Sequence, residues 1–252
     1  MQIYDPAFAR VYNARWAGFA HRVAPLIFDF YEQTPTGHEH KSLLDLCCGT
    51  GQLAGYFLAR DYRVTGLDSS PGMLAHAREN ARAHIEAGQA RFIEGDAADY
   101  ALDAPVGLVV ATYDALNHLP DRAALRGAFR STHAALVDGG WFIFDLNTRA
   151  GLLRWSGVNV QNDEDALLIT RGVVVAEQDR AYTQITGFTR QESGLYERFE
   201  QVAYNTMFDL AEVEAALREA GFHRAYCARV DALDTPLEHP ESESRVFIVA
   251  QK

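Results

Sequence analysis

Short apolar runs alternate with helical segments from residue 42 to residue 147, and this alternation constrains the fold more than any other feature of the chain. The apolar runs are SLLDL (42–46), RVTGLD (63–68), ARFIEGD (90–96), VGLVVATYD (106–114) and GGWFIFDLN (139–147). Patterns typical of helices separate them at 52–60, 69–88 and 121–136. Because strands that alternate with helices pair in parallel, we expect an α/β fold with helices on both faces of a mostly parallel sheet.

The two ends of the chain depart from this alternation. Residues 5–31 carry apolar side chains three and four apart, which predicts amphipathic helices, and PTGHEH (35–40) then breaks the pattern. Residues 166–207 are β-prone, without helical periodicity, and polar turns divide them. We expect an antiparallel β meander inserted into the α/β pattern, followed by a helix over 209–222 and two final strands that bring the sheet to seven.

Composition narrows the classes of partner. The 252 residues carry a formal net charge of -11, which disfavours nucleic acid as a partner. No apolar stretch approaches the ~20 residues of a membrane-spanning helix, so no membrane partner is expected. The first residues lack the pattern of a secretory signal, which predicts a cytoplasmic protein. The three cysteines have no zinc-site spacing, so we expect reduced thiols and no metal.

A glycine-rich turn in LLDLCCGTGQLA (43–54) is the strongest chemical signal. Gly49, Gly51 and Ala54 satisfy G-x-G-x-x-A, the fingerprint of dinucleotide binding, so a nicotinamide or flavin cofactor must be considered. Asp45 argues against it, because a carboxylate just before the loop would repel a pyrophosphate. The same carboxylate would attract a ligand that carries an ammonium or a sulfonium. An Asp that only caps the turn is the structural alternative.

Two further acidic residues follow later strands. Asp68 ends the second strand, at the spacing where an acidic side chain accepts both ribose hydroxyls. Asp96 ends the third strand, where an adenine amino group could donate to it, although an Asp at that place often caps a turn instead. Three acidic residues in this order favour an adenosine-containing ligand.

These segments together resemble the class I S-adenosylmethionine (SAM)-dependent methyltransferases over residues 41–147. LLDLCCGTGQLA is similar to the nucleotide loop of the family, GLDSSPGML (66–74) to the ribose-binding strand end, GDAADY (95–100) to the adenine-binding segment, and LVDGGWFIFDLN (136–147) to the strand after the active-site helix. The resemblance implies a Rossmann-like fold and SAM as cofactor. One departure is Cys47, which stands where the family usually has glycine. Expected SAM-binding residues are Tyr12, Trp16, Asp45, Cys47, Gly49, Gly51, Asp68, Ser69, Met73, Asp96, Ala97 and Thr112.

The overall layout resembles bacterial small-molecule methyltransferases, including amino-sugar N-methyltransferases and glycine N-methyltransferase. In such enzymes an N-terminal aromatic helix covers the cofactor, a role that falls here to Tyr12 and Trp16, although both could be ordinary core aromatics. We expect a single domain over 1–252. Its parts are a helical lid at 1–40, a SAM-binding core at 41–147, a β insertion at 158–207 and the end of the core at 208–252.

The stretch ATYDALNHLP (111–120) follows the fourth strand, where the methyl acceptor would sit. It offers Asp114, Asn117 and His118, and His118 is the predicted catalytic base because its unperturbed pKa lies near neutrality. A histidine that only positions the loop is an equal alternative. The meander is expected to line the acceptor pocket or to form a homodimer contact. Its candidate lining residues, whose face the alternation leaves open, are Tyr182, Tyr196, Arg198 and Tyr204.

The predicted function is transfer of a methyl group to nitrogen or oxygen of a small-molecule acceptor. A methyltransferase that acts on RNA or protein would share the cofactor motifs but would need a basic groove. A SAM-binding protein without turnover is a third reading. An NAD-dependent oxidoreductase rests on the glycine spacing alone and conflicts with Asp45.

Overall fold

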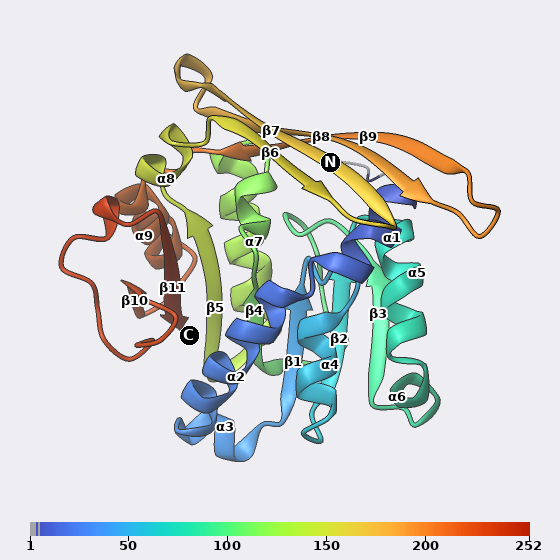
Figure 1. Ribbon diagram of the computed structural model, residues 1–252. Helices are drawn as coiled ribbons and strands as arrows, with labels where there is room; N and C mark the ends of the chain where they lie inside the picture. The colour runs from blue at the N-terminus through green and yellow to red at the C-terminus, as the bar shows by residue number, and fades with distance from the viewer. Residues whose placement is uncertain (1–3, 5) are drawn as a thin grey trace.

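The computed structural model describes Tyr4 and residues 6–252, so Met1–Ile3 and Asp5 of the expected lid lie outside the described residues. Within that part of the chain, seven strands form one sheet in the order β10-β11-β5-β4-β1-β2-β3. The strands are β1 (Ser42–Leu46), β2 (Arg63–Asp68), β3 (Ala90–Glu94), β4 (Val106–Ala111), β5 (Leu136–Asn147), β10 (Arg224–Ala228) and β11 (Arg245–Gln251). In this sheet β11 runs antiparallel to both of its neighbours, β10 and β5, and every other neighbouring pair is parallel. The predicted α/β fold is confirmed (Figure 1).

Helices cover both faces of this sheet because the central strands are apolar on both sides. On one face, α2 (Gly18–Glu32), α4 (Gln52–Leu58) and α5 (Pro71–Asn80) pack on a core that includes Leu43 and Val110. On the other face, α7 (Arg122–Ala135) and α9 (Leu210–Glu219) pack on a core that includes Leu44 and Val109. Consecutive strand residues thus enter opposite cores, as the period of two in a strand requires. Burial of the strands between these two cores fixes the positions of their carboxyl ends.

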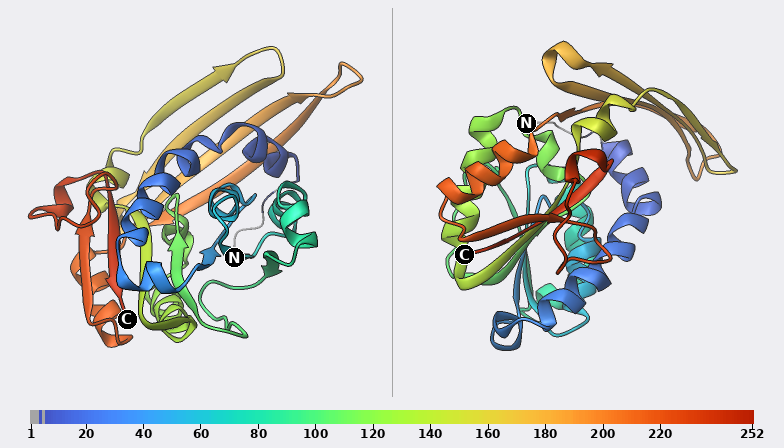
Figure 2. Two further views of the ribbon diagram at one scale, coloured as in Figure 1. Left: turned by 90° about the horizontal axis from the view of Figure 1, so that it is seen from below. Right: turned by 90° about the vertical axis from the view of Figure 1, so that its left-hand side faces the viewer.

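Four more strands form a separate antiparallel sheet, which we call the insert sheet. They are β6 (Gly157–Asn162), β7 (Ala166–Val175), β8 (Arg180–Arg190) and β9 (Tyr196–Thr206), paired in chain order within the described residues. The expected meander is confirmed, but β6 is not among the expected strands, because GVNVQN is exposed along its whole length and carries two asparagines. The insert sheet lies across the carboxyl ends of the core strands (Figures 1 and 2).

The first helix, α1 (Pro6–Arg15), lies between the core and the insert sheet. Phe8 and Val11 pack in one cluster with Met73 of α5 and with Ile185 and Phe199 of the insert sheet. At the far side of the cluster, Arg10 pairs with Glu197 and Arg15 pairs with Asp163. The N-terminal helix is therefore fastened to the insert sheet as well as to the core.

Three details differ from the expected elements. The segment expected to break the helical pattern forms α3 (Pro35–Glu39), because the Thr34 hydroxyl accepts from the Gly37 N–H and caps it. The helix expected over 69–88 is divided into α5 and α6 (Arg82–Glu86). A short helix, α8 (Arg149–Leu153), leads into the insert sheet. No helix in the described chain has the length and apolar character needed to cross a membrane.

Candidate active site

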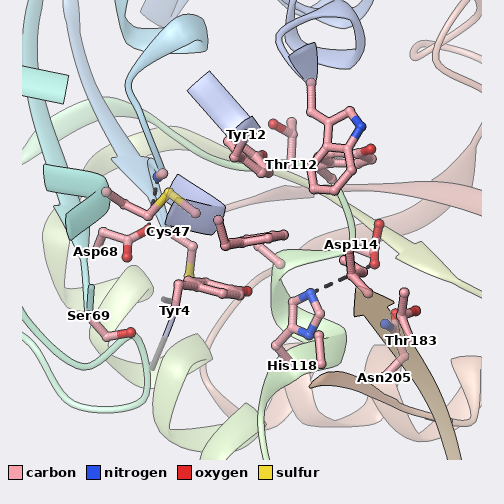
Figure 3. A pocket seen from close by; sticks show the side chains of 18 of the residues that line it. Tyr4, Tyr12, Cys47, Asp68, Ser69, Thr112, Asp114, His118, Thr183 and Asn205 are labelled. Atoms are coloured by element: carbon pink, nitrogen blue, oxygen red, sulfur yellow. Dashed lines mark hydrogen bonds and ion pairs between the residues drawn. The ribbon is translucent and has the colours of Figure 1, made fainter. Parts of the chain in front are cut away.

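A cavity of about 410 Å³ lies between the carboxyl ends of the core strands and the insert sheet. Four parts of the chain enclose it: α1, the loops after β1, β2 and β3, the segment after β4, and the inner face of the insert sheet (Figure 3). This volume is in the range of small-molecule sites. Of the residues predicted from the sequence, the cavity is lined by Tyr12, Trp16, Cys47, Gly49, Asp68, Ser69, Met73, Ala97, Thr112, Asp114 and His118.

The loop between β1 and α4 turns through left-handed backbone. Cys47 has φ 60° and Gly49 has φ 54°, and Gly51 has φ 81° where it precedes α4. A residue with a β-carbon is strained in this left-handed conformation, which glycine adopts freely. The usual preference for glycine at the position of Cys47 therefore has a conformational cause. Gly51 does not line the cavity; a β-carbon there would lie 3.2 Å from Cβ of Ala77, so this glycine allows α4 to approach α5.

Asp45 lies beside the main cavity rather than in it. Its carboxylate is 2% exposed and accepts from the Ala54 N–H at 3.1 Å, inside the first turn of α4. It lines a smaller cavity of about 30 Å³, together with Tyr12, Trp16 and Thr112, which also line the main cavity. Burial raises the pKa of Asp45 to about 7, because a single backbone donor does not replace the lost hydration.

Asp68 ends β2 with its carboxylate in the cavity. Its two oxygens accept from the Gly49 N–H and the Ser70 N–H, both at 2.8 Å. Burial raises the pKa of Asp68, and these backbone donors oppose the rise. The carboxylate therefore ties the glycine loop to the start of α5, while each oxygen keeps a further lone pair for a ligand.

Asp96 is not brought into the cavity. Its side chain is exposed and accepts from the Ala98 N–H at 2.9 Å, so it closes the turn after β3. Gly95 and Ala97 line the cavity from this turn instead. The turn-capping reading of Asp96 is the one that fits this placement.

Aromatic side chains in and beside α1 form one wall of the cavity. Phe8 and Tyr12 of α1 line it, as do Tyr4 before the helix and Trp16 just after it, and the four are spaced four residues apart in the sequence. The rings of Tyr4 and Phe8 are stacked with their centroids 5.1 Å apart, and those of Tyr12 and Trp16 meet edge to face with their centroids 5.8 Å apart. Sequence reasoning places only Tyr12 and Trp16 here, although the same spacing of four would have found the other two.

The segment after β4 is held in an uncommon backbone conformation by Asp145 of β5. Tyr113 has φ 68° and Asp114 has φ 50°. The carboxylate of Asp145, which is 0% exposed, accepts from the N–H of Tyr113 at 2.6 Å and of Asp114 at 2.9 Å. Arg245 of β11 donates to Asp145 and, at 2.7 Å, to Asp114. Sequence reasoning missed Asp145 and Arg245; an aspartate inside the apolar strand 139–147 was the available signal.

The charges of this group are coupled. Burial raises the pKa of Asp145 to about 6, although Arg245 opposes the rise. For Arg245 itself, burial is outweighed by Asp145 and Asp114, and its pKa rises above its usual range. One guanidinium thus faces two buried carboxylates, so the cavity beside Asp114 carries no surplus of positive charge.

His118 lies in the cavity at the end of the short helical turn η1 (Ala115–His118). Its Nδ1 is 2.6 Å from the carbonyl oxygen of Tyr204, which can only accept, so Nδ1 donates. In the neutral ring the basic nitrogen is then Nε2, which lies 3.9 Å from Oδ2 of Asp114 (Figure 3). Asn117 instead points into the protein, where its amide bonds the backbone of Asn147 and the carbonyl of Thr206.

The insert sheet contributes uncharged polar side chains to the cavity: Asn159, Gln161, Thr170, Thr183 and Asn205. The four candidates named from the sequence, Tyr182, Tyr196, Arg198 and Tyr204, do not line it. Thr183, Ala203 and Asn205 do, so the neighbouring Tyr182 and Tyr204 project from the opposite face. No group of three His, Cys, Asp or Glu side chains in the described residues is placed to hold a metal ion.

Comparisons with known proteins agree on one class. Residues 43–140 match a family model described as a methyltransferase domain. A putative methyltransferase of Geobacillus sp. (strain WCH70) is 27% identical over 84% of this chain and 85% of its own length. The dTDP-3-amino-3,4,6-trideoxy-alpha-D-glucopyranose N,N-dimethyltransferase of Streptomyces venezuelae is 28% identical over 89% of this chain and 93% of its own. A SAM-dependent methyltransferase from Clostridium acetobutylicum shares the fold with a TM-score of 0.80, at 18% identity over 97% of both chains.

Proposed function

Because this chain belongs to the class I SAM-dependent methyltransferases, we propose that it transfers a methyl group to a nitrogen or oxygen atom of a small-molecule acceptor. The observation that carries the proposal is the cavity of about 410 Å³, enclosed between α1, the core and the insert sheet. A macromolecular acceptor would need an open basic groove. The arginine that lines this cavity, Arg245, is instead paired with Asp114 and Asp145. The Streptomyces sugar N,N-dimethyltransferase, by its name, supports a small acceptor with a reactive nitrogen.

The residues around the glycine loop fit SAM. Asp68 has lone pairs in the cavity for the ribose hydroxyls, and Ser69, Met73 and Ala97 border the place for the adenine. The methionine part lies along Cys47 and Gly49, with its ammonium toward the carboxylate of Asp45 in the adjoining small cavity. Tyr12 of α1 and Trp16 directly after it cover this part of the ligand, which makes the N-terminal helix a lid. Gly51 supports the loop by packing against α5, and Asp96, which does not line the cavity, is not part of the proposed SAM site.

The acceptor occupies the other half of the cavity, beneath the insert sheet. SAM would supply a methyl group activated by its sulfonium: the acceptor's nitrogen or oxygen would attack the methyl carbon in line, the carbon–sulfur bond would break, and S-adenosylhomocysteine would leave as the neutral thioether. Asn159, Gln161 and Asn205 orient the acceptor through hydrogen bonds and do not compete for its proton. Because the insert sheet covers this half, it limits the access of water to the reacting atoms.

His118 is the proposed base. The acceptor's proton passes to Nε2, because Nδ1 is engaged in donating to the carbonyl of Tyr204. Asp114, whose Oδ2 lies 3.9 Å from Nε2, stabilises the imidazolium that forms. Arg245 and Asp145 act as positioning residues, since they hold Asp114 and the backbone that leads to His118.

The test of function is the fate of a labelled methyl group. The purified protein is incubated with methyl-labelled SAM and either a desalted metabolite extract or the macromolecular fraction of a lysate. Label that appears in small molecules supports the proposal, and mass spectrometry then identifies the product. Label in RNA or protein overturns it. If no label moves while calorimetry detects binding of S-adenosylhomocysteine, the chain is a SAM-binding protein without turnover.

The role of His118 is tested with His118→Asn, because an asparagine amide can still donate to the Tyr204 carbonyl but cannot accept the proton. We expect kcat to fall by about 100-fold or more, as loss of a general base does, with unchanged affinity for SAM. An unaltered kcat would leave His118 as a residue that only positions the loop.

A further inference from the structure

Two polar side chains of the insert sheet line the cavity beside the proposed base. Thr183 of β8 and Asn205 of β9 both face the cavity (Figure 3). His118 lies next to them, because its Nδ1 donates to the carbonyl of Tyr204, which directly precedes Asn205. Thr183 pairs with Ala203, so Asn205 is its diagonal neighbour on the same face. Such neighbours lie about 7–8 Å apart, so one small molecule can meet both side chains.

Trp155, which follows α8 and also lines the cavity, makes the hydroxyl of Thr183 a donor. Its indole Nε1 donates to the Thr183 oxygen at 3.0 Å. An indole N–H can only donate, so the Thr183 oxygen accepts in this bond and its own proton is left for another partner. Among the described residues no group accepts that proton. Gly172, opposite Thr183 on β7, makes room for the indole, because a β-carbon there would lie 2.6 Å from Cδ1 of Trp155.

Asn147 at the end of β5 orients the amide of Asn205 in the same sense. Asn205 is 3% exposed, and its Oδ1 accepts from Nδ2 of Asn147 at 3.2 Å. Asn117 holds Asn147 in turn: its Oδ1 accepts from the Asn147 N–H at 2.9 Å, and its Nδ2 donates to the Asn147 carbonyl. Within the part of the chain that the structure describes, no acceptor faces Nδ2 of Asn205. Because buried amides are normally paired, this NH2 group is left for a ligand in the cavity.

We propose, building on the function proposed above, that Thr183 and Asn205 form a donor pair that binds a neutral oxygen atom of the methyl acceptor: a hydroxyl, ether or carbonyl oxygen near the methylated atom. Trp155 and Asn147 have already satisfied the accepting side of each group, so both groups present N–H or O–H to the acceptor. A molecule without an oxygen at this place would leave two donors unpaired. A site of this kind rejects analogues that lack the bonded group.

The charges around the donor pair favour a neutral oxygen over an anionic one. Among the described residues that line the cavity, Arg245 is the only arginine or lysine. Its guanidinium is already paired with the carboxylates of Asp114 and Asp145. A carboxylate or phosphate of the acceptor would therefore approach Asp114 without a free cation to balance its charge. A hydroxyl, ether or carbonyl oxygen accepts from Thr183 and Asn205 without that repulsion.

The experiment compares small amines that differ by one oxygen atom. Cyclohexylamine and the positional isomers of aminocyclohexanol are titrated into the full chain saturated with S-adenosylhomocysteine, and NMR of the nitrogen-labelled protein follows the side-chain amides. At least one aminocyclohexanol should bind about 10-fold more tightly than cyclohexylamine or better, as one buried hydrogen bond provides, and should shift the Asn205 amide signals.

The variants Thr183→Val and Asn205→Asp keep the shape of each side chain but remove its donor, so each should lose most of this preference. Retained binding of S-adenosylhomocysteine shows that a variant is folded. Thr186→Val is the matched control, because Thr186 lies on the same strand but on the face opposite to Thr183, and it should keep the full preference.

Equal affinity for cyclohexylamine and every aminocyclohexanol would overturn the proposal, and so would the absence of binding at millimolar concentrations. Tighter binding of an aminocyclohexanecarboxylate than of the alcohols would show that the pair binds an anion. A preference that survives both Thr183→Val and Asn205→Asp would assign recognition to other residues. Since S-adenosylhomocysteine has no methyl group to transfer, this test is separate from turnover: an oxygen preference without any transfer of labelled methyl groups would remove the proposed function and leave the donor pair.

Discussion

The affinity for SAM should depend on pH through Asp45. In the ligand-free chain this carboxylate is 2% exposed and burial raises its pKa from 3.8 to about 7. The protonated form is therefore favoured in the folded protein, and the stability that this group contributes is greatest at low pH and is lost as pH rises toward 7. A cationic ligand needs the ionised form, so SAM must expel the proton in order to bind at lower pH.

The size of the effect follows from that pKa. If only the ionised form binds, the dissociation constant for SAM rises about 20- to 30-fold between about pH 7.5 and about pH 5.5, and tends toward tenfold per pH unit. The range ends at about pH 7.5 because an α-amine has a pKa of about 7.7–8.0, so the amino group of SAM is still mostly protonated there. The burial of Asp45 sets the magnitude of this pH dependence, and the positive charge of the ligand sets its sign.

Isothermal titration calorimetry with S-adenosylhomocysteine and SAM measures this directly. Titration in buffers of different ionisation enthalpy counts the protons released, which should approach one per ligand at the low end of the range. The Asp45→Asn variant should bind weakly at neutral pH and should lose the dependence. Asp68→Asn, the matched control, should weaken binding but keep the slope, because ribose hydroxyls are uncharged.

An affinity that stays constant across this range would refute the reasoning, because Asp45 would then not meet the charged end of SAM. A slope that persists in Asp45→Asn and disappears in Asp68→Asn would place the cationic end of the ligand beside Asp68 instead.

Three further changes test other parts of the site. Arg245→Met should lower the free energy of unfolding by about 3–5 kcal/mol at neutral pH and by less near pH 5, where Asp145, with its pKa of about 6, becomes protonated; equal losses in urea titrations at both pH values would contradict this. The free energy of unfolding of Cys47→Gly should exceed that of Cys47→Ala by about 1 kcal/mol in urea titrations, because glycine adopts φ 60° without strain; the reverse order would show that the backbone at this position is not strained. Arg15→Ala, which breaks the exposed ion pair with Asp163, should leave the urea midpoint almost unchanged but accelerate SAM dissociation in stopped flow; added salt should accelerate the wild type only.

Local patterns in the sequence predicted the parts of the site that depend on neighbouring residues. The turn through Gly49 follows from residues within the unit of β1 and α4, and the strand end at Asp68 and the helix capped by Ser70 follow from residues within the next unit, β2 and α5. Parallel strands present their carboxyl ends on one edge of a sheet. For this reason the order of residues alone was enough to place the first two strand ends and His118 around one cavity.

Local patterns did not predict which face of the insert sheet lines the cavity. The sequence offers Tyr182 and Tyr204 as candidates, but their neighbours Thr183 and Asn205 line the cavity. A strand with polar and apolar residues on both faces carries no signal for which face is covered, and a shift of one residue reverses every assignment. The choice is made only by what packs against the sheet, which is α1.

The chain's own order of residues determined its α/β fold, the match of residues 43–140 to a methyltransferase domain and the tight turn of the loop after β1, because each depends on short local patterns. Tertiary structure alone decided that Arg245 reaches Asp114 and Asp145 across 131 and 100 residues of sequence, that the Tyr204 carbonyl selects Nε2 of His118 as the basic nitrogen, and that Asp96 turns away from the cavity. Such contacts arise from how the sheets and helices pack, and no local pattern records which distant residues meet.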